Sequence, residues 1–76
     1  MFHKITKHKQ VNVTQVKSYS FFEKKDENDK TLYKVCFDMY KGETEFSEGF
    51  SSEENRDIFI TEFENKCFEI EKLLRR

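Results

Sequence analysis

Two histidines and two cysteines are the residues of this chain whose side chains could bind a metal. Together they supply two nitrogen and two sulfur donors, an inventory that zinc uses in proteins; they are His3, His8, Cys36 and Cys67. Their spacing does not suit zinc, because no two of them form a short knuckle or stand four residues apart on a helix. We therefore predict no zinc site and no other cofactor, and we expect both cysteines to be reduced, partly buried thiols.

A polar segment at residues 24–30, with the sequence KKDENDK, offers oxygen atoms of the kind that calcium binds. Asp26, Asn28 and Asp29 are spaced like the first ligands of a calcium-binding loop. No glycine follows at the sixth position of that loop, and its twelfth position is Phe37 in place of a bidentate glutamate. The segment is predicted to be a hydrophilic turn between two strands.

The sequence contains no constellation for nucleophilic catalysis, because a reactive cysteine or serine needs a base and an orienting group beside it. Cys36 falls in a predicted strand, Cys67 falls on the apolar side of a predicted helix, and both histidines lie in the first ten residues. Gly42 and Gly49 are the only glycines, which excludes a glycine-rich phosphate loop. We predict that the protein is not an enzyme.

The composition describes one small, charged domain. The chain has 76 residues, nine Phe and three Tyr, 38% charged residues and a net charge of −1. Residues 1–25 carry six lysines and one acid, whereas residues 26–76 carry an excess of acidic residues. A domain of this size has a thin core, so we expect a homodimer. No segment reads as a leader or as a membrane span, so we expect a cytoplasmic location and no membrane partner.

The strongest periodic pattern predicts an amphipathic helix over Ser51–Leu74. Ser51 and Glu54 have the spacing of a capping box at its start. The apolar residues follow at steps of three and four, which places them on one side of a helix: Phe59, Phe63, Cys67, Ile70 and Leu74, widened by Ile60, Phe68 and Leu73. Such a stripe requires an apolar surface built by the preceding residues.

The preceding residues alternate as strands do. The segment Val11–Lys24 is predicted to be the first strand. Its alternation of apolar and polar residues changes phase near residues 14–16, which indicates a β-bulge or a division into two short strands. The segment Thr31–Tyr40 is predicted to be the second strand, and its side chains alternate most clearly between the two faces. Its inward face, expected to meet the helix, consists of Tyr33, Val35, Phe37 and Met39.

A hairpin turn at Lys41–Gly42 leads to the third predicted strand, Glu43–Phe50, in which Phe46 and Phe50 are expected to point inward. The sequence therefore predicts a single α+β domain over residues 1–76, in which a three-stranded antiparallel β-meander, or four short strands, is packed on one face by the C-terminal helix. Residues 1–10 are expected to be a flexible basic arm. One helix covers one face of such a sheet, so the other face is expected to be open.

An open sheet face and an acidic helix together predict a protein-binding module. We interpret the chain as a small regulator or inhibitor, of the type that phages and mobile elements encode, that docks onto a larger protein. An acidic outer side of the helix can imitate the charge of a nucleic acid toward an enzyme that handles DNA or RNA. The residues predicted to contact the partner are Tyr19, Phe22, Leu32, Tyr40, Glu54, Asp57, Glu62 and Glu64.

The alternative hypothesis is a single-stranded nucleic-acid-binding protein. Basic residues with interleaved aromatic residues can hold a phosphate backbone and stack on its bases. Here they would be Lys7, Lys9, Lys17, Lys24, Lys34 and Tyr40. The order of strands followed by a helix is loosely similar to that of dimeric single-strand-binding coactivators, a likeness of element order alone. The acidic balance of the chain favours the protein-binding hypothesis.

Overall fold

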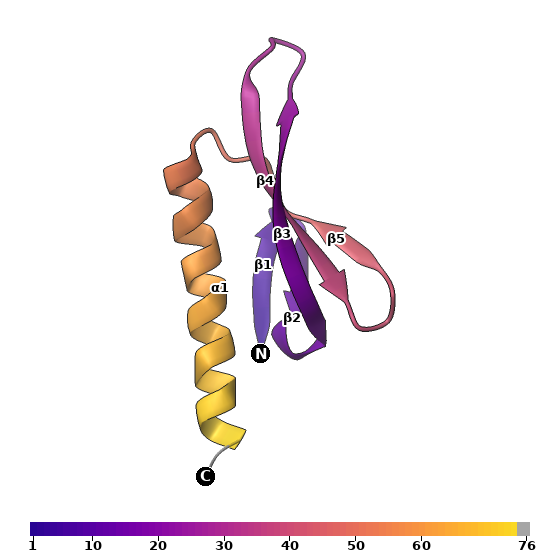
Figure 1. The fold of residues 1–76 in the computed structure, drawn as a ribbon, viewed down its shortest axis with the longest axis vertical. Helices are drawn as coiled ribbons and strands as arrows, with labels where there is room; N and C mark the ends of the chain where they lie inside the picture. Colours follow the sequence, from indigo (N-terminus) through magenta and orange to yellow (C-terminus); the bar gives the residue numbers. More distant parts are fainter. Residues whose placement is uncertain (75–76) are drawn as a thin grey trace.

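The computed structural model describes residues 1–74 and contains two antiparallel sheets and a long C-terminal helix (Figure 1). In the smaller sheet, β1 (Phe2–Thr6) pairs with β2 (Lys9–Asn12). A 3-10 turn at Val13–Gln15 leads into the larger sheet, whose strand order is β3-β4-β5. Its strands are β3 (Val16–Lys25), β4 (Thr31–Met39) and β5 (Thr44–Phe46), and the helix α1 follows at Glu53–Leu74. The α+β class predicted from the sequence is confirmed.

β4 is the central strand of the larger sheet and alternates as predicted. Val35 and Phe37 are fully buried on the face toward α1, and Tyr33 and Met39 are half-buried on the same face. Cys36, on the opposite face, is half-buried. Successive side chains of a strand point to opposite faces. The odd-numbered residues of β4 therefore face the core, and its even-numbered residues face the open side of the sheet.

The first half of α1 supplies the helical part of the core. Phe59, Ile60 and Phe63 are its buried residues. The ring centroids of Phe59 and Phe63 lie 6.1 and 5.1 Å from that of Phe37 on β4. These positions belong to the apolar stripe that the sequence predicts, so the orientation of the helix toward the sheet is confirmed.

α1 begins one residue later than the capping pattern predicts. The hydroxyl of Ser52 accepts a hydrogen bond from the backbone N–H of Asn55 at 3.1 Å, and its carbonyl accepts one from the N–H of Arg56 at 3.2 Å. Ser51, the predicted cap, instead accepts a hydrogen bond from the side-chain amide of Asn55. Either serine could precede the acidic first turn, so the pattern alone does not choose between them.

Residues 1–10 do not form the irregular arm expected from the sequence. They form β1 and the beginning of β2, and the side chains of His3 and Ile5 are buried together with Val11 and Val13. The buried His3 and Ile5 alternate with the exposed Phe2 and Lys4, as residues of a strand do. The sequence does not predict this strand, because a histidine at a core position does not read as apolar.

The phase slip near residues 14–16 is the boundary between two strands. β2 ends at Asn12, whose side-chain oxygen accepts hydrogen bonds from the N–H and the hydroxyl of Thr14 at 3.1 and 2.8 Å. These local bonds turn the chain through Val13–Gln15, so that β3 starts at Val16 in the other sheet. Both predicted features are present: the chain divides into two strands here, and a β-bulge follows between Val16 and Ser18.

The third strand is shorter than predicted, and Phe46 faces the opposite way. β5 ends at Phe46, which pairs with Cys36 and lies with it on the open face. The expectation that Phe46 points inward is therefore wrong. Phe50 does point inward, because its ring lies 5.0 Å from that of Phe59.

A buried hydroxyl at the end of β5 joins the two sheets. The Oγ of Ser47 accepts a hydrogen bond from the N–H of Val35 at 2.8 Å and donates one to the carbonyl of Glu48 at 2.9 Å. The N–H of Glu48 then donates to the carbonyl of Ile5 in β1 at 2.8 Å. These hydrogen bonds connect the larger sheet to β1 of the smaller sheet. They satisfy the backbone N–H groups of Val35 and Glu48 and the carbonyls of Ile5 and Glu48.

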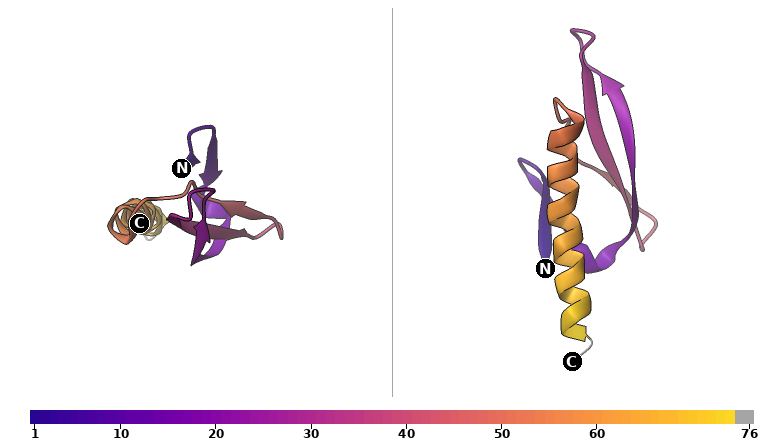
Figure 2. Two further views of the ribbon diagram at one scale, coloured as in Figure 1. Left: turned by 90° about the horizontal axis from the view of Figure 1, so that it is seen from above. Right: turned by 60° about the vertical axis from the view of Figure 1, so that its left-hand side comes forward.

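α1 and the β1–β2 hairpin share the same face of the larger sheet (Figure 2). The core contains residues from the hairpin, from β4 and from α1. Within residues 1–74 no element covers the other face, as expected. At one end the β3–β4 hairpin projects past the start of α1, and at the other end α1 continues past the strands (Figure 1).

The packing of α1 on β4 predicts the cost of removing one ring. Phe63→Ala should lower the free energy of unfolding by about 3–5 kcal/mol, because a buried phenylalanine is lost from the centre of the core. Asn65→Ala, on the exposed side of the same turn, should change it by less than about 0.5 kcal/mol. Urea denaturation measures both. Equal, small effects would show that α1 does not pack on the sheet in this way.

Candidate functional site

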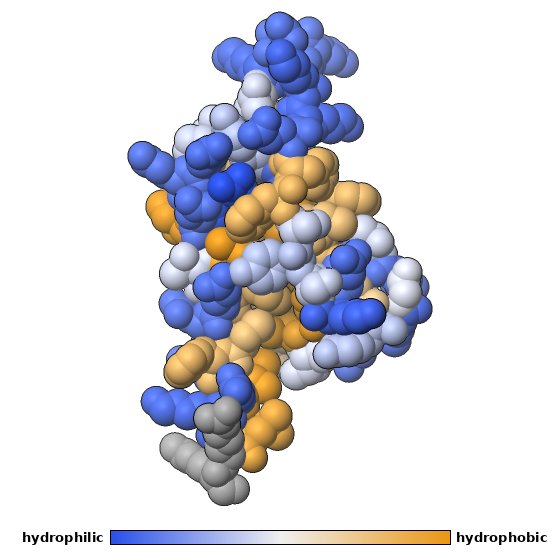
Figure 3. All heavy atoms as spheres, in the orientation of Figure 1, coloured by the Kyte–Doolittle hydropathy of each residue, from blue (hydrophilic) through white to orange (hydrophobic). Residues whose placement is uncertain are grey.

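The last turns of α1 run beyond the sheet and expose apolar side chains. Phe68, Leu73 and Leu74 are 70%, 60% and 81% exposed, and Ile70 is half-buried at the edge of the core. Figure 3 shows hydrophobic atoms gathered at this end of the molecule. Single exposed leucines are common on protein surfaces, but a cluster at the end of a helix marks a place where another molecule can bind.

The sequence pattern contains all of these residues but does not show that they are uncovered. The predicted stripe runs to Leu74 and requires an apolar surface built by the preceding residues. The position of α1 along the strands is set by the contacts of Phe59 and Phe63 with Phe37 on β4. Periodicity reports the direction in which a side chain points around the helix, and it contains no information on where the sheet ends.

The open face of the larger sheet carries an uncovered pair of phenylalanine rings. Phe22 on β3 and Phe46 on β5 meet edge to face across β4, with ring centroids 5.6 Å apart. The Nζ of Lys34 lies 5.9 Å from the Phe22 ring, and Phe46 is 49% exposed. This face is a second apolar surface, and it contains one of the predicted partner-binding residues, Phe22.

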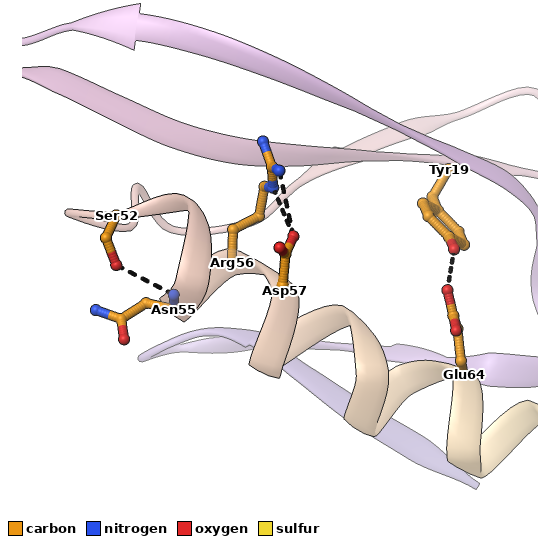
Figure 4. A network of polar contacts seen from close by, with 6 residues as sticks. All are labelled: Tyr19, Ser52, Asn55, Arg56, Asp57 and Glu64. Atoms are coloured by element: carbon orange, nitrogen blue, oxygen red, sulfur yellow. Dashed lines mark hydrogen bonds and ion pairs between the residues drawn. The ribbon is translucent and has the colours of Figure 1, made fainter.

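Tyr19, one of the residues predicted to contact a partner, lies on the packed face of the larger sheet. Its hydroxyl donates a hydrogen bond to the carboxylate of Glu64 on α1 (Figure 4), and its ring meets that of Phe63 edge to face at 5.8 Å. The hydrogen bond to Glu64 and then burial raise the pKa of Tyr19 to about 12. Tyr19 therefore connects β3 to α1 and is only partly available to a partner.

Of the other apolar residues predicted to contact a partner, Leu32 lies on the open face with Phe22, whereas Tyr40 lies outside the sheet. Leu32 is packed against Gly49 so closely that a Cβ at Gly49 would lie 3.0 Å from its side chain. Tyr40 is exposed beyond the end of β4, where its backbone N–H donates to the carbonyl of Gln15 at 2.9 Å. The predicted apolar set is therefore distributed over the molecule.

The predicted acidic residues of α1 are exposed, but two of them already have partners. These residues are Glu54, Asp57, Glu62 and Glu64. Asp57 accepts hydrogen bonds from the guanidinium of Arg56 at 3.2 and 3.3 Å (Figure 4), and Glu64 accepts one from Tyr19. Asp57 is paired with a cation and Glu64 is held by a tyrosine of the same chain, so these residues are weaker imitations of a phosphate row than free carboxylates.

The lysines of the nucleic-acid hypothesis do not form one surface either. Lys7 and Lys9 lie at the β1–β2 turn, where Lys4, His8 and Gln10 complete a shallow hollow, and Lys9 forms an ion pair with Glu45. The hairpin belongs to the packed side of the larger sheet, whereas Lys24 and Lys34 belong to its open side. Lys17 is exposed on β3. The basic and aromatic groups therefore face different directions.

His3 is buried, with 2% of its surface exposed, between the rings of Phe59 and Phe63 at centroid distances of 4.7 and 5.5 Å. Its Nδ1 lies 2.9 Å from the Nζ of Lys66, and its Nε2 has no hydrogen-bond partner within residues 1–74. Burial, and then the charge of Lys66, lower the pKa of His3 below its usual 6.5, although the carboxylate of Glu62 acts in the opposite direction. A neutral imidazole that accepts a hydrogen bond from Lys66 fits these surroundings.

Cys36 and Cys67 are free thiols with little nucleophilic character. Burial raises the pKa of both, and the nearby carboxylates of Asp38 and Glu64 raise them further. A raised pKa lowers the fraction of thiolate, which is the reactive form. In the part of the chain that the structure describes, no three His, Cys, Asp or Glu side chains are grouped as metal ligands.

Comparisons of the chain with models of protein families, with curated proteins and with solved structures gave no match. The single helix within residues 1–74 is not apolar enough to cross a membrane. What remains to indicate a function is the geometry of the exposed surfaces.

The buried, neutral His3 should make the protein less stable in acid. The unfolded chain takes up a proton at His3 at a higher pH than the folded chain does, since the folded pKa is lowered. This contribution to stability is complete above pH 6.5 and is lost below it, by at most about 1.4 kcal/mol per pH unit. Urea denaturation at a series of pH values measures the slope. His3→Phe should flatten it and the exposed-site control His8→Gln should not; an unchanged slope in His3→Phe would contradict the assignment.

The hydrogen bond between Tyr19 and Glu64 should be visible in an alkaline titration. A tyrosine absorbance change should occur near pH 12, because the folded state holds this proton more tightly than the unfolded state does. The corresponding stability is present below the usual pKa of 10 and is lost as the pH rises toward 12. The change should be absent in Tyr19→Phe and should move to lower pH in Glu64→Ala. Glu69→Ala, an exposed glutamate one turn further on, is the control, and a shift of equal size there would refute the pairing.

Proposed function

We propose that this protein is a small, non-enzymatic module that binds another protein and regulates or inhibits it. The observation that carries the proposal is the uncovered apolar end of α1. Leu73 and Leu74 are exposed there, beside the half-buried Ile70. Apolar surface of this kind gains free energy when a partner removes it from water, at roughly 25 cal/mol per Å².

The spacing of the residues at this end suits a helix that lies in an apolar groove. Cys67, Ile70 and Leu74 stand three and four positions apart, on the side of α1 that faces the sheet further up, and Leu73 flanks them. Peptide helices that bind in grooves present their anchors at this spacing. The partner that fits is a protein with a hydrophobic groove, and the charges of Glu69 and Lys72 would lie at its rim.

Protein binding fits the surfaces better than binding of a single-stranded nucleic acid does. One observation favours nucleic acid, the Phe22–Phe46 pair with Lys34 beside it on the open sheet face. A nucleic-acid site also needs a continuous basic track along the backbone. The lysines here are divided between two sides of the sheet, and Lys9 is paired with Glu45. As part of the proposal the module acts in the cytoplasm, where free thiols stay reduced.

Changing the end of α1 should abolish capture of the protein partner. A tagged protein should recover one stoichiometric protein from cells of its source, and the double variant Leu73→Ser with Leu74→Ser should not. Both positions are exposed, so each substitution should change the free energy of unfolding by less than about 0.5 kcal/mol. The matched control is Ile58→Ser, since Ile58 is 60% exposed near the other end of the same helix.

Two results would contradict this proposal. One is capture that survives the double variant but is lost in Phe46→Ser, which would move the site to the open sheet face. The other is tight binding of a labelled single-stranded oligonucleotide that weakens steeply with salt, as release of counterions from phosphates requires.

A further inference from the structure

β3 lies at one margin of the larger sheet, and its outer edge is unpaired. The strand order is β3-β4-β5, so β3 has β4 on one side and no strand on the other. β3 spans ten residues, and in Figure 1 its upper half forms with β4 a hairpin that stands clear of the rest of the fold. A long exposed edge of this kind is a template for pairing with another strand.

The backbone bonds of β4 show which groups of β3 point outward. Tyr33 exchanges two backbone hydrogen bonds with Phe50 at 2.8 Å, and the carbonyl of Val35 accepts one from Ser47 at 2.9 Å. Tyr33 and Val35 therefore direct their backbone groups away from β3. Because these directions alternate along a strand, Lys34 and the other even-numbered residues of β4 bond to β3.

The even-numbered residues of β3 complete this ladder. Ser20 and Phe22 stand opposite even-numbered residues of β4, so their N–H and C=O groups point inward to it. The N–H and C=O groups of Tyr19, Phe21 and Glu23 consequently point outward. Within residues 1–74 these outward groups have no backbone partner.

We propose that two copies of this protein pair antiparallel along their β3 edges, about a two-fold axis at Ser20, and form a continuous six-stranded sheet. Tyr19 of each copy then exchanges two backbone hydrogen bonds with Phe21 of the other. A two-fold interface uses the same edge of both copies, so pairing stops at two. This interface is separate from the end of α1 and therefore goes beyond the proposed protein-binding function.

The charges on β3 select this register. With the axis at Ser20, Lys17 lies opposite Glu23 of the second copy, and the pair occurs twice. With the axis at Phe21, Lys17 would lie opposite Lys25. With the axis at Glu23, two glutamates would face each other. Lys17 is the unpaired residue of the bulge between Val16 and Ser18, so the regular part of β3 ends at this charge pair.

The position of α1 leaves room for the helix of the second copy. The backbone of α1 lies closest to β4 and to the 3-10 turn, and its side chains reach β3, since Glu64 bonds to Tyr19 and the guanidinium of Arg56 lies 4.2 Å from the Phe21 ring centroid. With each helix over β4 of its own copy, the two axes are about three strand spacings apart, roughly 14 Å, so the two helices do not overlap.

Disulfide cross-linking at the axis tests the interface directly. The background is the variant with Cys36→Ser and Cys67→Ser, because Ser20 lies opposite Cys36 and a cysteine there could pair within one chain. With oxidised glutathione, Ser20→Cys should give a covalent dimer, since residues at the axis have Cβ atoms about 5 Å apart. Ser18→Cys is the matched control and should stay monomeric, because its two copies are about 14 Å apart. Failure of Ser20→Cys to cross-link, or equal cross-linking of Ser18→Cys, overturns the proposal.

Charge reversal tests the register without introducing a covalent cross-link. In sedimentation experiments Lys17→Glu should raise the dissociation constant of the dimer roughly tenfold, and adding Glu23→Lys should restore it. The double variant Leu73→Ser with Leu74→Ser should leave the dimer unchanged, which separates this interface from the site for the protein partner. A mass of 9.3 kDa for the unaltered protein at every concentration tested, or a dimer sensitive only to the change in α1, overturns the pairing along β3.

Discussion

The contact of Phe37 with Phe59 and Phe63 is the interaction on which the rest of the fold depends. Phe37 is fully buried at the centre of β4, and the two helix rings pack on it from successive turns of α1. Only 36% of the residues are hydrophobic, so a few large rings have to supply the core. The same contact fixes how far along the strands the helix sits, and so determines which of its turns remain uncovered.

The β1–β2 hairpin completes a core that one helix cannot close. Ile5 and Val11 cover the part of the packed face that α1 does not reach, and the His3 ring lies between the rings of Phe59 and Phe63. A backbone hydrogen bond from Glu48 to Ile5 joins the hairpin to the segment after β5, next to the buried hydroxyl of Ser47. Burial of an imidazole with one unpaired nitrogen costs stability, and this cost is offset by the contacts of its ring with Phe59 and Phe63.

The features that the sequence predicts correctly are those set by local periodicity. The second strand, the Lys41–Gly42 turn, at which Gly42 has φ +90°, and the apolar stripe of α1 each follow from residues close in the chain. The wrong predictions concern features fixed by distant residues. The direction of Phe46 depends on the bond between Ser47 and Val35, twelve positions apart, and the burial of His3 depends on α1, about sixty positions away. For the same reason the predicted contact residues are individually exposed or half-buried but do not gather into one site.

Two surfaces lack partners within residues 1–74, the outer edge of β3 and the apolar end of α1. Their positions are consistent with separate uses. The edge of β3 lacks backbone partners, a deficit that another strand satisfies by directional bonds. The last turns of α1 lack an apolar neighbour, a deficit that any complementary hydrophobic groove satisfies without directional bonds. The two surfaces lie on different elements, so occupying one does not require displacing anything from the other. The proposed association with a copy of the same chain and the proposed capture of a different protein are therefore compatible, the first extending the sheet and the second using the end of α1.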